Sequence, residues 1–358
     1  MKLNISIIGS GAFGLSAALE LSKNKNYNVT VYDKNKKILD GATFANHNRH
    51  HYGFHYPRSN KTLEQINYSK DIFEFYFKKA CVFNFDNFYA ISKTRSNINS
   101  LDYENFLVKN SLNYKKVKIN NLIFNKNSID SVFKVKEGIY DFNVLKKIYE
   151  ERIKNSRIKF NLNYELVSGK IGRKSFLIFK NKNRLKKINT DIVINASYAN
   201  YNDIISLFAF KKISSEYNLQ EFAVISFKKN YRVGVTIMDG NYPSILPVGN
   251  TKFHLFAHVK ESQLIKEINS KNDLFKNNYI VTNYENLFKE SSKYINLLKN
   301  CHYHYSILSG RVVKKNKNDT RTSDIIIHSD NFYSLFGAKI ITTEYSSLKL
   351  ANHINSIY

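Results

Sequence analysis

The chain has 358 residues, and its 55 lysines and arginines against 29 aspartates and glutamates give a formal net charge of +26 at pH 7. A hydrophobic content of 43% excludes a disordered basic tail protein, because that much apolar side chain can offset the entropy lost on folding. Lys, Asn, Ile, Phe and Tyr are abundant together, whereas the chain has only 13 Gly and 3 Pro. This pattern favours a bias of the coding sequence over nucleic-acid binding as the origin of the charge.

The sequence carries few signals of export or of metal binding. Cys81 and Cys301 are its only cysteines and lie far apart, so neither a disulfide framework nor a zinc ribbon is expected, and the cytoplasm is the expected compartment. The N-terminal apolar stretch is interrupted at once by polar residues and glycines, unlike a secretion signal. No uninterrupted apolar window is long enough to predict a transmembrane helix. His254 and His258 share one face of an expected strand, but no third ligand completes a metal site.

The first 33 residues form a dinucleotide-binding pattern. An expected buried strand at residues 3–8 is followed by three glycines at the spacing Gly-x-Gly-x-x-Gly: Gly9, Gly11 and Gly14. An apolar helical stripe comes next, and then a second strand that ends at Asp33. The glycines allow a tight turn, a close approach of the backbone to a pyrophosphate and tight helix–strand packing, and the acid accepts hydrogen bonds from ribose hydroxyls. The order of these parts predicts a dinucleotide site.

The identity of the dinucleotide depends on whether a second glycine motif is present. Flavoproteins that a nicotinamide reduces usually carry one, and none of the glycines after Gly14 makes that spacing. The chain is therefore expected to bind a single dinucleotide, which is either NAD(P) or an FAD that the substrate reduces directly. An NAD(P)-dependent Rossmann dehydrogenase is thus the alternative to a flavoprotein.

Residues 42–59, ATFANHNRHHYGFHYPRS, favour FAD. The segment is dense in His, Asn, Arg and Tyr and follows the strand that ends in the acid. It resembles the flavin-contacting segment of the FAD-dependent D-amino-acid-oxidase-like (DAO) superfamily, nearest to the L-2-hydroxyglutarate oxidase and glycerol-3-phosphate dehydrogenase branch. The resemblance implies that the segment runs along the isoalloxazine ring, so Asn46, Arg49, His50 and His51 would be flavin neighbours.

Three further stretches extend the resemblance over most of the chain. Residues 191–200, DIVINASYAN, resemble the strand and turn that return to the pyrophosphate, with Ser197 and Tyr198 where the family has Thr and Gly. Residues 310–327 resemble the family's Gly-x-Arg-Pro stretch near flavin and substrate, without its proline. Residues 332–351 resemble the closing strand and helix, in which a turn aims a helix N-terminus at the flavin pyrimidine oxygen.

The glycine motif and the resemblance together define the cofactor site that we expect. Its residues are Gly9, Gly11, Ala12, Phe13, Gly14, Asp33, Lys34, Asn46, Arg49, His50, His51, Val167, Ala196, Ser197, Gly337, Ala338, Lys339, Ile340 and Thr342. No spacing favours a covalent link to the flavin through His51 or Cys301, so we expect FAD to be held non-covalently.

The cofactor motifs lie at the start, middle and end of the chain, so the FAD-binding domain is expected to be discontinuous. We expect an α/β fold, in which a Rossmann-like FAD-binding domain with a doubly wound parallel sheet carries an inserted α+β substrate domain with an antiparallel sheet. The FAD-binding domain would comprise residues 1–80, 140–210 and 305–358, and the substrate domain residues 81–139 and 211–304. Helices are expected at 62–80, at 141–155 and near 284–299, and strands of the substrate sheet at 83–92, 221–228, 232–239, 244–249 and 252–259.

Members of the superfamily move a hydride from a carbon that bears an alcohol or an amine to flavin N5, and the resemblance implies the same reaction here. The protein would hold a small, anionic substrate and take up the O–H or N–H proton. An arginine suits the anion because its planar fork matches a carboxylate or a phosphate, which favours Arg311 first and Arg321 second. A histidine titrates near neutral pH, so His51 and then His55 are the expected catalytic bases.

A small-molecule substrate is the expected partner, and oxygen or an electron carrier would reoxidise the flavin. A non-enzymatic nucleotide-binding protein is a further alternative. A specific nucleic-acid partner would require basic residues on one face interleaved with aromatic residues, and no such motif stands out. The sequence leaves open whether the substrate is a hydroxy acid, an amino acid, a polyol phosphate or a sugar.

Overall fold

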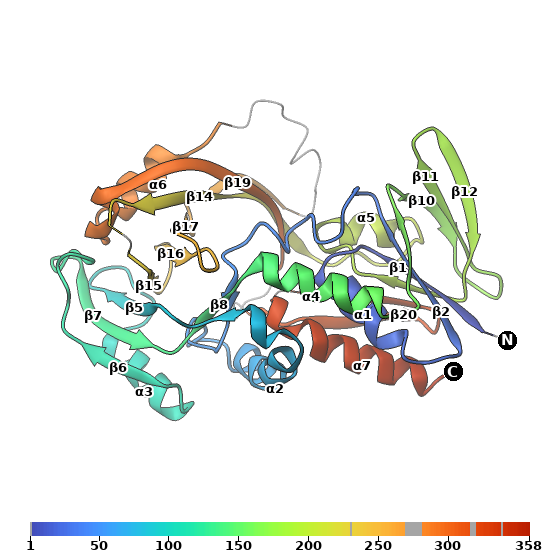
Figure 1. The fold of residues 1–358 in the computed structure, drawn as a ribbon, viewed down its shortest axis with the longest axis horizontal. Coiled ribbons are helices and arrows are strands. Elements are labelled where there is room, and N and C mark those ends of the chain that lie inside the picture. The colour runs from blue at the N-terminus through green and yellow to red at the C-terminus, as the bar shows by residue number, and fades with distance from the viewer. Residues whose placement is uncertain (1, 230, 269–280, 316–319, 338) are drawn as a thin grey trace.

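The computed structural model of the chain describes residues 2–229, 231–268, 281–315, 320–337 and 339–358. The molecule is elongated (Figure 1). One end carries both termini and combines helices with a sheet, and the other end is built mainly from a second, larger sheet.

A six-stranded sheet forms the centre of the part that carries the termini. Its order is β20-β21-β13-β1-β2-β9, and all neighbouring pairs are parallel except β20 and β21. The strands are β1 Leu3–Ile8, β2 Tyr27–Asp33, β9 Lys159–Leu162, β13 Ile192–Asn195, β20 Asp324–Ser329 and β21 Phe332–Phe336. All four residues of β13 are buried, as expected of a strand that is covered on both faces. This sheet confirms the Rossmann-like parallel arrangement that the sequence predicted.

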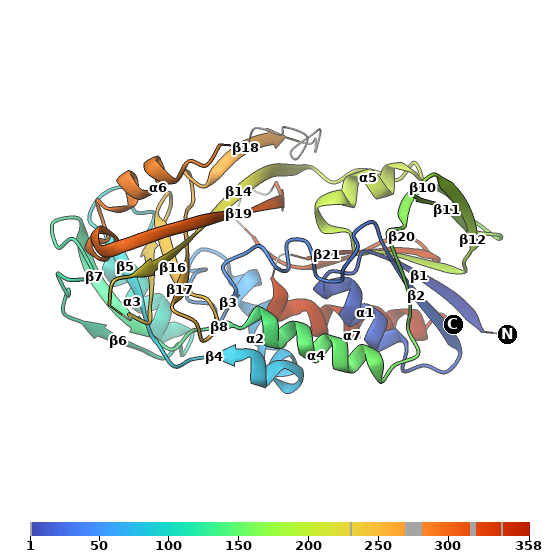
Figure 2. The ribbon, with the colours of Figure 1, turned by 45° about the horizontal axis from the view of Figure 1, so that its top comes forward.

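Four helices pack together beside this sheet (Figures 1 and 2): α1 Ala12–Leu21, α2 Asn60–Phe77, α4 Phe142–Lys154 and α7 Thr343–Asn355. A polar cluster joins three of them. The carboxylate of Glu344 in α7 accepts a hydrogen bond from the Ser16 hydroxyl of α1 at 2.6 Å. It also accepts from both terminal nitrogens of Arg152 in α4, each at 3.0 Å. Because Glu344 is almost fully buried, this bidentate pair fixes the start of α7 against α1 and α4.

A three-stranded antiparallel sheet lies beyond the six-stranded one, at the end of the molecule that carries the termini (Figure 1). Its strands are β10 Glu165–Lys170, β11 Phe176–Asn181 and β12 Arg184–Asn189. Phe179 of β11 is fully buried and stacks on Tyr32 of β2, with ring centroids 4.2 Å apart. The inner face of this small sheet is thus packed firmly on the rest of the domain.

A nine-stranded sheet makes up most of the other end of the molecule. Its strands are β5 Asp86–Ser92, β6 Tyr114–Val117, β7 Ile129–Val135, β14 Ser215–Phe227, β15 Val233–Met238, β16 Pro243–Pro247, β17 Phe253–His258, β18 Gln263–Ile268 and β19 Cys301–Lys314. Neighbouring strands are antiparallel except β5 and β15. The long strands β14 and β19 run side by side toward the centre of the molecule (Figure 2). This sheet confirms the antiparallel substrate sheet that was expected.

The remaining elements are short. They are the helices α3 Ser100–Lys109, α5 Tyr201–Ser206 and α6 Tyr284–Ser291, the 3-10 turns η1 Lys78–Ala80, η2 Tyr198–Asn200, η3 Asn296–Asn300 and η4 Ile340–Thr342, and the strands β3 Arg49–His50, β4 Cys81–Val82 and β8 Gly138–Tyr140. The last three form a small sheet in the order β3-β8-β4. The chain passes through β4 and β8 on its way into and out of the nine-stranded part, so this small sheet ties the two parts together.

The predicted helices agree with the structure to within a few residues, since α2 with η1 covers residues 60–80 and α4 covers 142–154. Near 284–299 the structure has the short helix α6 and the turn η3. One expected domain boundary, at residue 305, falls inside β19, which pairs with β14 along its whole length. We therefore propose that the cofactor-binding part resumes after Lys314.

Candidate active site

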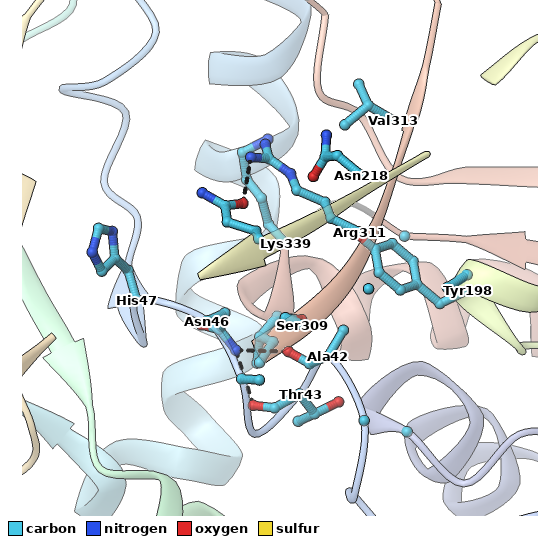
Figure 3. A pocket seen from close by; sticks show the side chains of 18 of the residues that line it. Ala42, Thr43, Asn46, His47, Tyr198, Asn218, Ser309, Arg311, Val313 and Lys339 are labelled. Carbon is cyan, nitrogen blue, oxygen red and sulfur yellow. Dashed lines mark hydrogen bonds between the residues drawn. The ribbon is translucent and has the colours of Figure 1, made fainter. Parts of the chain in front are cut away.

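A long cavity of about 1230 Å³ lies between the six-stranded and the nine-stranded sheets. Its walls come from the β1–α1 turn, the end of β2, the segment that follows it, strands β14 to β17, β19, and the turn before η4. Figure 3 shows residues from distant parts of the chain, among them Asn46, Arg311 and Lys339, around the same space. A cavity lined by both parts lets a cofactor held by one meet a substrate held by the other.

The glycine turn between β1 and α1 lines one end of the cavity. Gly9 has a φ of +110°, and a Cβ there would lie 2.6 Å from the carbonyl oxygen of Ala196. Gly14 lies behind it, where a Cβ would lie 1.9 Å from the Gly9 carbonyl oxygen, so it serves packing and does not face the cavity. The predicted turn residues that do line the cavity are Gly9, Gly11, Ala12 and Phe13. Gly11 is the N-cap of α1 and has no side chain to cap it, and the first helical N–H, that of Ala12, donates to the Thr43 hydroxyl at 3.2 Å. The residues of this helix N-terminus line the cavity, where an anion could bind.

Asp33, at the end of β2, lines the cavity, and its carboxylate also holds the glycine turn. Oδ2 accepts hydrogen bonds from the Ser10 backbone at 2.6 Å and from its hydroxyl at 2.7 Å, and Oδ1 accepts from the Asn35 backbone at 2.8 Å. The neighbouring Lys34 lines the cavity too and donates to the side-chain oxygen of Asn200 at 3.1 Å. The role of Asp33 toward a ribose stays a prediction.

Asn46 lines the cavity, but its amide is engaged by its own loop. The nitrogen donates to the carbonyl oxygens of Ala42 and Thr43, each at 2.9 Å (Figure 3). The oxygen accepts from the Asn48 backbone at 2.7 Å and from the Tyr140 hydroxyl at 2.8 Å. All donors and acceptors of the amide are thus used, and the side chain fixes the shape of the loop beside the cavity.

Arg49 lies in the cavity wall, where a buried carboxylate neutralises its charge. Nη1 donates to Glu137 Oε2 at 2.9 Å and also to the Tyr89 hydroxyl, and Nη2 donates to the Thr236 hydroxyl at 2.9 Å. Although burial disfavours the charge, the nearby Tyr89 and Glu137 raise the pKa of Arg49 above its usual value. The guanidinium is therefore a permanent cation that is held in one position.

His50 does not line the cavity, and its role as a flavin neighbour stays a prediction. Its Nε2 lies 2.8 Å from Glu74 Oε1, and its ring packs against Phe73. Arg49 and His50 are consecutive in β3, and consecutive strand residues point to opposite faces. Because Arg49 faces the cavity, His50 must face away.

The two predicted bases, His51 and His55, both line the cavity, with ring centroids 6.5 Å apart. Nε2 of His51 lies 3.5 Å from the Tyr56 hydroxyl. The Nδ1 atoms of both histidines are buried and have no hydrogen-bond partner in the part of the chain that the structure describes. Burial lowers the pKa of both imidazoles well below the usual value, and the charges of Arg49 and Lys339 add to the effect. Both rings are therefore neutral at pH 7, as a base must be.

The two predicted anion-binding arginines reach the cavity from different elements. Arg311 of β19 lies opposite Asn218 of β14 (Figure 3), and its Nη1 donates to Gln220 Oε1 at 3.1 Å. Arg321 precedes β20, and its backbone N–H donates to the Thr62 hydroxyl at 3.0 Å. Two guanidinium groups therefore reach the same space as the histidines.

The turn that follows β21 closes the cavity near these arginines. Gly337, Lys339 and Ile340 line the cavity, and Ala338 lies outside the described residues. Thr342 is fully buried behind the turn and donates to the Lys339 carbonyl oxygen at 2.7 Å, and its contact with a cofactor stays a prediction. Its hydroxyl holds the turn in shape.

Lys339 and Gly337 each depend on a residue from another element. The Lys339 ammonium lies 4.3 Å from the centre of the Tyr56 ring and donates to the Arg321 carbonyl oxygen. A Cβ at Gly337 would lie 2.0 Å from the Phe13 ring, so only a glycine lets the turn approach the start of α1 this closely.

The end of β13 returns to the glycine turn as predicted, and Ala196 and Ser197 line the cavity. Tyr198, which stands where the family has Gly, has a φ of +48° and so keeps the left-handed conformation typical of glycine. Val167 lies at a bulge of β10, where the register with β11 shifts, and the neighbouring Leu166 lines the cavity in its place. The contact of Val167 with a cofactor stays a prediction.

Sequence reasoning missed the cavity residues that come from β14 and from the centre of the loop after β2. Asn218, Gln220 and Phe222 alternate along β14, so one face of that strand lines the cavity. His47 lines it as well, with Nδ1 3.3 Å from the Ser244 hydroxyl. Burial, with help from nearby arginines, lowers the pKa of His47 to about 3. The signal for β14 was present as polar residues at alternate positions of an otherwise apolar strand.

The described ranges contain neither a cluster of metal-ligating side chains nor a helix that could span a membrane. No group of three or more His, Cys, Asp or Glu side chains in those ranges could hold a metal ion. Among the helices of the same residues, none is both long enough and apolar enough to cross a membrane.

The residues present fit an FAD. The glycine turn offers a close backbone approach and an accessible helix N-terminus for a pyrophosphate, and Asp33 lies beside it for a ribose. From there the cavity continues past Asn46 and Arg49 to the turn at Gly337 and Lys339, whose ammonium could offset the negative charge of a reduced flavin. The same cavity reaches β14 and β19, so room for a substrate adjoins the cofactor space.

Comparisons with known proteins agree with this assignment. Residues 4–105 match the model of the DAO family, described as FAD dependent oxidoreductase. No curated protein sequence matches the chain. The fold is similar to glycine oxidase from Geobacillus kaustophilus (TM-score 0.80, 10% identity, 99% of this chain and 95% of that chain covered). It is also similar to FAD-bound L-α-glycerophosphate oxidase from Mycoplasma pneumoniae (0.74, 14%, 99% and 95%) and to L-proline dehydrogenase from P. horikoshii (0.73, 15%, 99% and 94%).

At these identities the solved structures establish the fold, and the family model supplies the sequence match over the cofactor-binding N-terminal segment. The glycine turn, the acid after β2 and the closing turn all line one cavity that fits FAD. Residues 4–105 therefore match the FAD dependent oxidoreductase (DAO) family model, and the chain has the fold of the solved oxidases and dehydrogenase named above.

Proposed function

We propose that the chain oxidises a small anionic substrate at a carbon that bears a hydroxyl group. The observation that carries this proposal is that two cationic groups, Arg311 and Arg321, share one cavity with two neutral imidazoles, His51 and His55. When bound, FAD accepts a hydride from the substrate carbon. The protein must then hold the substrate anion and remove a proton from the hydroxyl.

The anion is assigned to Arg311 first and to Arg321 second. A planar guanidinium can donate two parallel hydrogen bonds to a carboxylate or a phosphate. Gln220 lines the cavity beside Arg311, and its side-chain oxygen accepts a hydrogen bond from Nη1 of Arg311 at 3.1 Å. The charge of Arg321 is among the causes that lower the pKa of His55, which places this arginine near the second candidate base.

Removal of the hydroxyl proton is assigned to His51 first and to His55 second. An alcohol needs a base before it can lose a hydride, whereas an amine can react from its own neutral form, so neutral imidazoles in the cavity favour a hydroxyl-bearing carbon. The Tyr56 hydroxyl, 3.5 Å from Nε2 of His51, would fix the orientation of that ring. A CH–NH substrate is the alternative, and for it the histidines would take the proton that an ammonium group must lose before hydride transfer.

Oxygen or an electron carrier is the proposed acceptor, because the sequence contains no second glycine motif for a nicotinamide. The cytoplasm is the proposed compartment, because Cys81 and Cys301 are both free thiols.

Anaerobic bleaching of the flavin absorbance tests the proposal. The purified holoenzyme is mixed with hydroxy acids, polyol phosphates, amino acids and neutral sugars, and the expected result is bleaching by an anionic hydroxy compound. Bleaching by amino acids alone would overturn the hydroxyl assignment, and bleaching by neutral sugars alone would overturn the anion assignment.

Two variants separate the binding of the substrate anion from the removal of the hydroxyl proton. Arg311→Ala should raise the substrate concentration needed for half-maximal bleaching by about 100-fold, the loss of roughly 2 to 3 kcal/mol of charged hydrogen bonding, while the FAD content stays normal. His51→Gln should slow bleaching at saturating substrate by 100-fold or more. His302→Gln, at an exposed position of β19, is the matched control and should change neither quantity. Loss of FAD from the Arg311 variant would show that this arginine holds the cofactor instead.

A further inference from the structure

The outer face of the β10–β12 sheet carries an unusual concentration of positive charge. Residues 164–190 contain eight lysines and arginines against a single acidic residue, Glu165. All eight side chains are exposed: Lys170, Arg173, Lys174, Lys180, Lys182, Arg184, Lys186 and Lys187. The sheet projects from the domain next to α5, well away from the nine-stranded sheet (Figure 1).

None of these eight cations forms an ion pair with any residue that the structure describes. Lysines elsewhere on the surface do find partners, as Lys116 does with Glu104 at 2.7 Å and Lys134 does with Asp86 at 2.6 Å. Glu165 is the one acid among these eight cations, so most of the charge of the small sheet is uncompensated within the described parts of the chain, and a net positive field extends from it into the solvent.

The strand register shows which of these residues share the outer face. Paired residues of neighbouring strands point to the same side, and in this sheet Lys180 pairs with Leu185, Ile178 with Lys187, and Phe176 with Lys170. The opposite face contains Leu177 and Phe179, which are buried against the domain. By the same register Glu165 pairs with Lys180, Ser168 with Ile178 and Asn189 with Phe176. The outer face therefore carries three lysines and three apolar side chains, Lys170, Lys180 and Lys187 with Phe176, Ile178 and Leu185, next to the two polar residues and the single acid Glu165.

The apolar members of this face are open to solvent. Leu185 is 70% exposed, and Phe176 and Ile178 are partly exposed. Leu185 lies in β12, which is the edge strand of the sheet. The ammonium of Lys187 lies 4.0 Å from the centre of the Phe176 ring, so that ring is covered by a cation. The uncovered apolar surface is thus mostly aliphatic.

We propose that this outer face binds an anionic lipid surface. Lysines near such a surface gain electrostatic attraction to the headgroups, and apolar side chains between them enter the boundary between headgroups and acyl chains. A single-stranded nucleic acid would instead need exposed aromatic rings for base stacking, and here the one ring is covered by a lysine. The buried inner face, with Phe179 stacked on Tyr32, supports the outer face on a rigid base.

Contact through this face would place the protein on the lipid surface without any spanning segment. The three outer-face lysines and Leu185 do not line the cavity, so substitutions there leave the cofactor and substrate groups in place. The inference is therefore independent of the proposed substrate and can fail or succeed separately from it.

Co-sedimentation of the FAD-loaded protein with vesicles tests the proposal. The vesicles contain phosphatidylcholine alone or phosphatidylcholine with phosphatidylglycerol, at low and at high salt. The expected result is binding to the anionic vesicles only, with at least a tenfold loss of affinity between 50 and 500 mM salt because salt screens the attraction. Absence of binding to anionic vesicles at low salt would overturn the proposal.

Matched variants separate this face from the general charge of the protein. Lys170→Glu, Lys180→Glu and Lys187→Glu together should weaken binding to anionic vesicles by 100-fold or more. The control triple Lys109→Glu, Lys118→Glu and Lys126→Glu changes the net charge equally at exposed positions of the other part of the molecule and should cost less than threefold. Equal losses in the two triples would show that net charge alone attracts the protein, which overturns the proposal.

Two further measurements identify the nature of the partner. Leu185→Ser should weaken vesicle binding about fivefold without changing its salt dependence, since it removes only an apolar contact. Binding of a single-stranded or duplex DNA probe that the outer-face triple abolishes, in the absence of vesicle binding, would assign the face to nucleic acid and overturn the lipid assignment. Unchanged flavin absorbance and circular dichroism confirm that each variant is folded.

Discussion

The guanidinium of Arg49 and the carboxylate of Glu137 form an ion pair at 2.9 Å in the wall of the cavity, with side chains only 5% and 0% exposed. The pair joins β3 of the small connecting sheet to the segment just before β8. Glu137 Oε1 also accepts a hydrogen bond from the Tyr52 backbone at 2.9 Å, so the carboxylate is bonded on both oxygens. The pair therefore holds the cavity segment and its cation in one position.

Glu137→Gln should destabilise the protein strongly, because it leaves the buried Arg49 charge without a counter-ion. Breaking a buried pair in this way costs about 3 to 5 kcal/mol. Urea unfolding at pH 7 measures the change. The control is Asp86→Asn, which breaks the exposed pair with Lys134 and should cost at most about 1 kcal/mol. A loss below about 1 kcal/mol for Glu137→Gln would contradict the idea that the pair carries a buried charge.

Gly9→Ala should reduce both the stability and the FAD content. Its φ of +110° is strained for any residue with a side chain, and the added Cβ would lie 2.6 Å from the Ala196 carbonyl oxygen, which is backbone and cannot move aside easily. The strain is expected to cost about 1 to 3 kcal/mol. Flavin absorbance per protein and urea unfolding are the measurements.

Gly41→Ala is the control for this position, since a Cβ at Gly41 would have no atom within 4 Å and the residue has no positive φ. Its unfolding free energy should stay within about 1 kcal/mol of the wild type. An equal loss in the two variants would mean that the effect at Gly9 does not come from the close approach to Ala196.

The β1–α1–β2 unit could be predicted from the sequence because its signals are local. An apolar strand, three spaced glycines and a terminal acid each report on backbone within a few residues of themselves. The long pairing of β14 with β19 joins residues far apart in sequence, from Phe227 with Cys301 to Ser215 with Lys314, and neither sequence identifies the strand with which it pairs. The expected boundary at residue 305 therefore falls inside β19.

Within the site, the direction in which a side chain points decides whether it lines the cavity, and the local sequence does not determine that direction. Arg49 and His50 are adjacent and similar in chemistry, yet a two-residue strand turns one toward the cavity and the other toward Glu74. Asn46 lies at the cavity as expected, but its amide is engaged by four hydrogen bonds, three within its own loop and one from Tyr140. Such choices depend on tertiary neighbours and leave no trace in the local sequence.

The stability should fall as the pH drops below about 6.5, because buried histidines are neutral in the folded state and become protonated on unfolding. Burial lowers the pKa of His47 to about 3 and that of His51 and His55 well below the usual value. The unfolded chain therefore binds more protons below pH 6.5, and each such histidine costs up to about 1.4 kcal/mol per pH unit until the folded-state pKa is reached.

Urea unfolding at pH 7.5 and at pH 5.5 measures this loss, and variants assign it. His55→Gln should lose about 1.4 kcal/mol less than the wild type between the two pH values, since it removes one of the groups that must be protonated. The exposed His302→Gln should show the same loss as the wild type. An unchanged pH dependence in His55→Gln would mean that this imidazole is not kept neutral in the folded protein.

The rate of flavin reduction should fall at acidic pH, because the base can accept the substrate proton only while its imidazole is neutral. At low substrate concentration the second-order rate constant reports the groups of the free enzyme. The pKa of His51 is lowered well below 6.5 by burial and by the charges of Arg49 and Lys339, so the unprotonated form predominates throughout neutral pH. The rate constant should therefore stay flat from pH 8 to pH 6.5 and fall only at more acidic pH, when the ring gains a proton.

Anaerobic stopped-flow absorbance measures this rate constant, with a substrate whose own ionisation lies outside this range. An acidic limb with its midpoint at or above pH 6.5 would contradict the assignment of a buried, charge-repelled imidazole as the base. Arg49→Met, which removes one of those charges, should move the acidic limb to higher pH if the variant retains FAD.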